Sequence, residues 1–177
     1  MRILLGFILA LSVSFACDQP YEEVGGYKIG CPFDDKSGFI LDKSKAKDGI
    51  SVYKSKLKNS FFQEVSVEVI NGNIEGVSFD KKYHDDDSSF LDDEDVLLAT
   101  LKERWGEFVA IDISRYNKIY SFRNTNSEVI DRVSVFRFVN GPTAIISLNY
   151  YSKNQSKHYE LIIDNEKSKK QDQLTNF

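Results

Sequence analysis

Hydrophobic and polar residues alternate between positions 65 and 79, and this pattern predicts a β-hairpin. Residues 65–69 read Val-Ser-Val-Glu-Val, which is the period-two pattern of a half-buried strand. Asn71-Gly72 follows, and both residue types accept the positive φ that a two-residue hairpin turn requires. Residues 74–79 are therefore expected to return antiparallel to the first strand.

A second hairpin is expected between positions 130 and 151, with strands at 130–139 and 143–151 and a turn at Asn140-Gly141-Pro142. It resembles the first hairpin, because the Val-Ser-Val of 65–67 recurs at 133–135 and an Asn-Gly pair recurs after it. Two interpretations stay open. The chain contains an internal duplication of one hairpin unit, or a common hairpin pattern has arisen twice.

The spacing of apolar residues changes to that of a helix between positions 96 and 105. One helical face collects four large apolar residues, namely Leu97, Leu98, Leu101 and Trp105. Acidic residues at 92–95 precede this segment, where carboxylates favour a helix N-terminus, and Gly106 is suited to end it. We predict one principal helix at about 92–105.

The remaining apolar segments are short and are separated by glycine, proline and asparagine, which predicts strands joined by turns. These strands are expected at 27–29, 39–41, 50–53, 108–113, 119–122 and 159–163. The fold class predicted from these elements is α+β, with a mainly antiparallel sheet, one principal helix, and two hairpin units whose duplication is left open.

The N-terminus has the organisation of a secretory signal peptide. Arg2 is followed by the uncharged, mostly apolar residues 3–16, which are too few to span a membrane as a helix. Ser14 and Ala16 are small residues at the positions expected before a cleavage site. We predict a signal peptide at 1–16, a single domain at 17–163 and a polar, flexible tail at 164–177; the alternative for the N-terminus is a buried helix or strand.

The two cysteines, Cys17 and Cys31, allow two interpretations. In an oxidising compartment an even cysteine count favours a disulfide. A cysteine directly after a signal peptide also resembles the lipid-bearing cysteine of a bacterial lipoprotein, although Ser14 and Phe15 depart from the usual motif before that cysteine. The disulfide is the favoured prediction, and an oxidised pair predicts a periplasmic or secreted protein. A membrane-anchored lipoprotein is the alternative.

Composition and charge exclude some classes of function and leave others. The 177 residues carry 23 Lys and Arg against 27 Asp and Glu, a formal net charge of −4. Nucleic acid is not an expected partner, because phosphate binding requires a basic face. Two histidines and two cysteines are too few for most metal sites that these residues build. We expect no metal and no cofactor.

An acidic run between positions 85 and 95 is the most concentrated charge in the chain. It does not fit a calcium-binding loop that starts at Asp85, because Phe90 stands where the turn glycine is needed and Val96 where the bidentate glutamate is needed. Helix capping explains Asp92 to Asp95, and Asp85 to Asp87 form either a solvated loop or part of a partner-facing acidic patch. If a charged patch faces the partner, the acidic run is favoured over the lysines, and its candidate residues are Asp85, Asp86, Asp87, Asp92 and Asp93.

A group of lysines forms the second candidate for partner binding. Lys54, Lys56 and Lys58 alternate, so they share one face if this segment is a strand. Lysines also protect edge strands from unwanted pairing. The group therefore predicts either a protected sheet edge or a basic patch that steers a partner.

No catalytic motif is present, since no serine lies in a Gly-x-Ser-x-Gly elbow and no catalytic residue can be named. The sequence favours an exported, non-enzymatic binding protein of the inhibitor or immunity type, or another protein-interaction module, whose partner is a protein of the cell envelope or the extracellular space. The alternatives are a small secreted hydrolase that uses carboxylates in a cleft, and a lipid-anchored envelope assembly or structural component.

Overall fold

A computed structural model describes residues 17, 19–34, 36–84, 89–123 and 126–158. The predicted signal peptide, the expected strand at 159–163, the tail and the residues Asp85, Asp86 and Asp87 lie outside the described residues.

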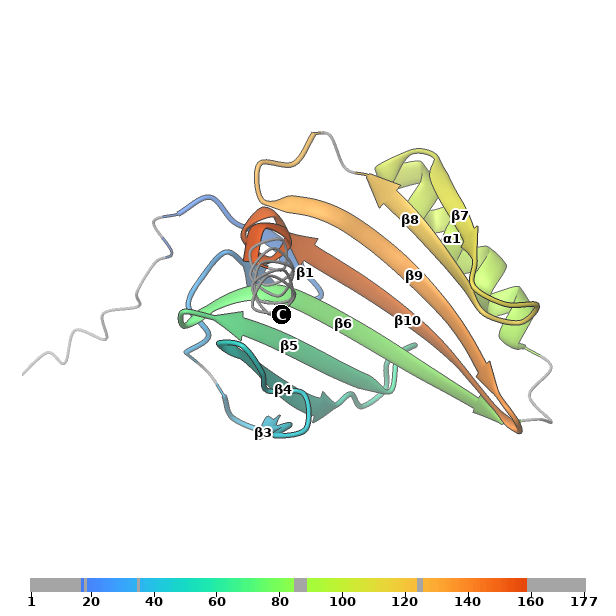
Figure 1. Cartoon of the computed structure of the whole chain (residues 1–177), viewed down its shortest axis with the longest axis horizontal. Helices are drawn as coiled ribbons and strands as arrows, with labels where there is room; N and C mark the ends of the chain where they lie inside the picture. The colour runs from blue at the N-terminus through green and yellow to red at the C-terminus, as the bar shows by residue number, and fades with distance from the viewer. Residues whose placement is uncertain (1–16, 18, 35, 85–88, 124–125, 159–177) are drawn as a thin grey trace, which may run out of the picture.

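The described chain forms an antiparallel sheet in the order β3-β4-β5-β6-β10-β9-β8-β7, a separate β1-β2 hairpin and one long helix. This confirms the α+β class. Figure 1 shows α1 beside β7 and β8, with β3 at the opposite edge of the sheet. The elements are β1 (Glu22–Val24), β2 (Tyr27–Ile29), β3 (Ile40–Leu41), β4 (Ile50–Lys56), β5 (Glu64–Ile70), β6 (Asn73–His84), α1 (Phe90–Trp105), β7 (Phe108–Asp112), β8 (Lys118–Arg123), β9 (Ile130–Asn140) and β10 (Thr143–Ser152).

The large sheet consists of two four-stranded meanders that meet at its centre. Strands β3 to β6 run in order from one edge inward, and strands β7 to β10 run inward from the other edge. The two meanders meet where β6 pairs antiparallel with β10, and Phe79 lies opposite Leu148 in this pairing. Both predicted hairpins therefore supply the central strands of one sheet (Figure 1).

The two central hairpins turn differently. Asn71 and Gly72 occupy the first turn with φ of 52° and 86°, as the Asn-Gly pair predicts. In the second hairpin Asn140 still pairs with Thr143, so Gly141 and Pro142 form the turn. The two Asn-Gly pairs that look equivalent in the sequence thus differ by one position in the structure, and duplication stays a prediction.

Helix α1 covers one face of the sheet near β7 and β8. Its buried residues Leu98 and Leu101 belong to the main core together with Phe122 and Val135, and Leu97 and Trp105 pack against that core half-buried. The predicted apolar face is confirmed. Gly106 ends the helix with φ of 76°, and its N–H bonds to the carbonyl oxygen of Lys102 at 2.9 Å. The helix begins two residues earlier than the start predicted at about 92, because the Phe90 ring packs on Tyr83.

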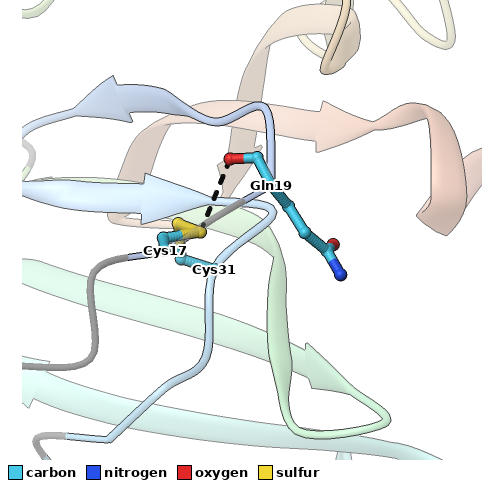
Figure 2. Close-up of a disulfide and its surroundings, with 3 residues drawn as sticks. All are labelled: Cys17, Gln19 and Cys31. Carbon is cyan, nitrogen blue, oxygen red and sulfur yellow. Dashed lines mark hydrogen bonds between the residues drawn. A yellow bond between two sulfur atoms is a disulfide. The ribbon is translucent and has the colours of Figure 1, made fainter.

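The N-terminal segment covers the same core from the side of the first meander. Val24, Ile29 and Phe33 belong to the buried cluster. Cys31 follows β2 and is bonded to Cys17, with 5.5 Å between their Cα atoms, so the predicted disulfide is present (Figure 2). Figure 2 also marks the 3.7 Å approach of Cys17 Sγ to the carbonyl oxygen of Gln19, which is a contact because a disulfide sulfur has no proton to donate.

The sheet face opposite α1 carries a row of small polar residues across five strands. They are successive cross-strand partners, in the order Ser66, Ser78, Asn149, Ser134 and Ser121. The Ser78 hydroxyl donates to Asn149 Oδ1 at 2.6 Å. Residues 153–158 are helical and lie against this face, where the Gln155 amide donates to Glu68. Gly76 permits the approach, since a Cβ there would lie 2.7 Å from Gln155 Oε1.

Candidate functional site

An open groove at the β3–β4 edge combines exposed aliphatic side chains with lysines. Ile40 is 76% exposed and Leu41 is also exposed, although both belong to strand β3. The groove has a volume of about 820 Å³, and its lining includes Ile40, Leu41, Lys43, Lys54, Lys56 and Lys58. Asp42 and Glu64 also line the groove. An exposed aliphatic pair beside four lysines can contact an apolar side chain while the lysines attract acidic groups around it.

Lys54 is fixed in the groove by two carboxylates. Its Nζ lies 2.9 Å from Asp42 Oδ2 and 3.8 Å from Glu64 Oε1. The hydrogen bond from Lys54, together with one from the Ser44 hydroxyl, holds the pKa of Asp42 well below its ordinary value. The same bond to Asp42 raises the pKa of Lys54. Lys54 is therefore a positioned cation that is partly neutralised within the chain.

Lys56 and Lys58 are exposed and extend the positive charge of the groove. Lys56 is the last residue of β4 and lies on the same sheet face as Lys54, but Lys58 follows the strand in a loop. Strand β4 is next to the sheet edge, because β3 pairs with its residues Tyr53 and Lys54. Lys54 and Lys56 therefore share one strand face as predicted, whereas Lys58 lies beyond the strand. All three lysines nevertheless line the groove.

The acidic candidates are not gathered in the same way. Asp92 is exposed in the first turn of α1. Asp93 points toward the sheet, where its Oδ2 accepts from Lys81 Nζ at 2.6 Å and from the Tyr83 hydroxyl at 3.0 Å. Burial alone would raise the pKa of Asp93, but the bonds from Lys81 and Tyr83 hold it below its ordinary value. Asp93 thus docks the helix on the sheet.

A buried ion pair next to Asp93 was not found by sequence reasoning. The carboxylate of Glu94, whose side chain is 3% exposed, lies 2.9 Å from Arg137 Nη1 on β9. Burial and the neighbouring Glu94 carboxylate raise the pKa of Tyr120 to about 12. In the sequence Glu94 is one acid of a run, and only its place on the same helical face as Leu98 and Leu101 distinguishes it.

Facing carboxylates do occur beside the groove. Glu64 and Asp80 are direct cross-strand partners on β5 and β6, and Lys56 and Lys82 line the same depression of about 340 Å³. Lysines on both sides of the acids make this a charge-balanced surface. Within the described residues, no group of three or more His, Cys, Asp or Glu side chains is arranged to hold a metal ion.

Ile40 and Leu41 are the residues of the groove that sequence reasoning did not single out. Residues 39–41 look like an ordinary buried strand, yet only Phe39 packs against the core. Its ring lies 5.1 Å from that of Phe33, edge to face. The signal that could have found the pair is its position, because two aliphatic residues directly precede the segment 42–49, in which three of eight residues are lysine.

None of the described helices is long and apolar enough to cross a membrane. The disulfide uses both cysteines and is compatible with an oxidising compartment such as the periplasm or the extracellular space. Compared with known proteins, the chain matches no family model, no curated protein and no solved structure.

Proposed function

We propose that this protein is an exported binding protein that holds another protein at the β3–β4 groove. The observation that carries the proposal is the exposure of Ile40 and Leu41 in a groove that four lysines also line. A partner that fits this surface presents an apolar side chain surrounded by acidic groups. An inhibitor or immunity-type protein, or another interaction module of the cell envelope, would use such a surface.

The arrangement of charge supports a role in recognition. Lys54 is held in place by Asp42 and Glu64, so its ammonium is ordered before any partner arrives. Lys56 and Lys58 are exposed, which leaves them able to attract an acidic surface from a distance. The groove thus combines an ordered cation, two steering cations and an apolar contact.

The proposed place of action is the periplasm or the extracellular space. The signal peptide predicted at 1–16 directs export and is then removed. The disulfide supports this placement, because reducing compartments keep such pairs as thiols. In the described structure Cys17 is bonded to Cys31, and a sulfur in a disulfide does not carry a lipid.

The experiment uses the mature, oxidised chain as bait in extracts of the extracytoplasmic fraction, followed by mass spectrometry. The test variant is Lys56→Glu with Lys58→Glu, which reverses the steering charges and leaves the Lys54 pairs intact. The control is Lys153→Glu with Lys157→Glu, which changes the net charge equally at two exposed lysines of the helical segment 153–158. We expect a partner that the wild type and the control retain and the test variant loses.

The association rate of that partner should then fall as salt rises, and the Lys56→Glu, Lys58→Glu variant should show a flatter dependence, since ions screen charges over about 8 Å at physiological strength. An Ile40→Ser variant should leave this salt dependence unchanged and speed dissociation. If the test variant and its control capture the same proteins at the same rates, the groove is not the binding surface.

A further inference from the structure

Strand β7 forms the opposite edge of the sheet, and no strand among the described residues pairs with its outer side. Among the described strands β7 pairs only with β8. The Ile113 N–H bonds to the Asn117 carbonyl at 3.0 Å, so the odd-numbered residues of β7 are those bonded to β8. The N–H and C=O groups of Phe108, Ala110 and Asp112 consequently point away from the sheet and can bind another strand.

Apolar side chains surround this edge. Val109 is 66% exposed and Ile111 is 50% exposed, and both point to the sheet face opposite α1. Ile113, Tyr116 and Phe138 are exposed close by, in the β7–β8 turn and on β9. Ile119 and Phe136 extend the row across the sheet, since Ile111, Ile119 and Phe136 are successive cross-strand partners. This gathering of large exposed apolar groups is typical of an interaction surface.

The strand has few of the devices that keep edges from pairing, since its one charged residue, Asp112, lies at its end. Residues 108–112 read Phe-Val-Ala-Ile-Asp, without lysine or proline, and the described register with β8 contains no bulge. Among the described strands β7 therefore offers five residues of regular edge to a partner strand.

We propose that the β7 edge binds a second copy of this chain, with the two β7 strands antiparallel about a twofold axis at Ala110. In this register the outward groups of Ala110 face their own copies, and those of Phe108 face those of Asp112 in the second copy. Val109 of each copy lies opposite Ile111 of the other, so the exposed aliphatic residues cover one another.

Charge at the two ends of the strand fits the same arrangement. Glu107 precedes β7 and Arg115 follows it in the turn, and both are exposed. Antiparallel association brings Glu107 of one copy, which Lys102 pairs at 2.7 Å, to the end of the other copy that carries Asp112 and Arg115. Both signs of charge are therefore present at each end of the paired strands, and Arg115 is the cation that the second copy brings toward Glu107. The dimer leaves both β3–β4 grooves free at its far ends, and the proposal is independent of what those grooves bind.

The register is tested by cysteine cross-linking of the mature, oxidised chain. Ala110→Cys places two thiols opposite each other in a hydrogen-bonded pair, where Cα atoms about 5.5 Å apart suit a disulfide. Val109→Cys places its thiol opposite Ile111 of the second copy and is the matched control. We expect Ala110→Cys to form a linked dimer at least about tenfold faster than Val109→Cys. Equal rates would overturn the proposed register.

The association itself is measured by analytical ultracentrifugation over a wide concentration range. The wild type should form a dimer reversibly, and Val109→Lys with Ile111→Lys should stay monomeric throughout. The control is Leu91→Lys with Val96→Lys, which replaces two exposed aliphatic residues of α1 and adds the same charge, and it should dimerise like the wild type. Thermal melts show whether each variant is folded. A wild type that is monomeric at every concentration, or a dimer that survives the β7 double variant, would overturn the proposal.

Discussion

The two edges of the sheet occupy matching places in the two meanders, yet they differ in chemistry. Strand β3 has two residues and lies next to a strand rich in lysine, whereas β7 has five residues and exposes Val109 and Ile111. Short strands and lysines limit edge pairing, and a longer apolar strand promotes it. The comparison teaches that one sheet architecture can offer a charged edge to a different partner and an apolar edge to a copy of itself.

The two halves are also supported differently beneath these edges. The β7–β10 half is braced by α1, through an apolar face and the buried Glu94–Arg137 pair. The β3–β6 half is covered by the N-terminal segment that the disulfide closes. Substitutions in α1 should therefore mainly destabilise the half that ends in β7, and loss of the disulfide should mainly destabilise the half that ends in β3.

The largest expected effect is at the buried ion pair. Arg137→Ala leaves the Glu94 carboxylate buried without its cation, which should lower the free energy of unfolding by about 3–5 kcal/mol in urea denaturation. Lys118→Ala is the control, because its pair with Asp112 is exposed and should contribute under about 1 kcal/mol. Similar losses for both variants would contradict the distinction between the two pairs.

The apolar face of α1 should come next. Leu101→Ala removes a side chain from the buried core and should cost about 2–5 kcal/mol of unfolding free energy. Val96→Ala on the same helix should change it by under about 0.5 kcal/mol, since Val96 is 66% exposed. Equilibrium denaturation measures both, and a loss below half a kilocalorie at Leu101 would show that the helix does not brace the sheet.

On the other side, the disulfide should stabilise the β3–β6 half. It joins cysteines 14 positions apart, and closing a loop of this size contributes roughly 3 kcal/mol in the chain-entropy model. Reduction should therefore lower the denaturation midpoint. Hydrogen exchange should rise first in β2 and in the start of β6, to which residues 30–33 are hydrogen-bonded. If reduction raised hydrogen exchange first in α1, the disulfide would not be the main support of the β3–β6 half.

The smallest expected effect is the response to acid. Asp42 at the β3 edge and Asp93 on α1 both have a pKa below the ordinary 3.8. A lowered carboxyl pKa gives stability that is present above that ordinary value and is lost as pH falls through the folded-state pKa. Stability should decline below about pH 4. Asp42→Asn and Asp93→Asn should each flatten the decline; unchanged slopes would show that neither acid is paired in solution.

Local signals predicted most of the regular elements. The alternation at 65–69 and the Asn71-Gly72 turn gave the first hairpin, because a strand period and a positive-φ turn need no distant contact. The helix and its Gly106 end followed from spacing and capping in the same way. The extension of β6 through the polar residues 80–84 was missed, since its alternation is visible only once β10 pairs with it.

The sequence by itself determined the period of the first hairpin, its Asn71-Gly72 turn and the apolar face of α1, because each depends on neighbouring residues, and the cysteine count favoured the disulfide over a lipid-bearing Cys17. Only the tertiary structure decided which acids are buried. Asp92, Asp93 and Glu94 are adjacent in one run, yet Asp92 is exposed, Asp93 is half-buried against Lys81, and Glu94 is buried against Arg137. The same long-range pairing decided that β3 and β7, which local sequence does not mark as edges, are the strands left without an outer neighbour among those described.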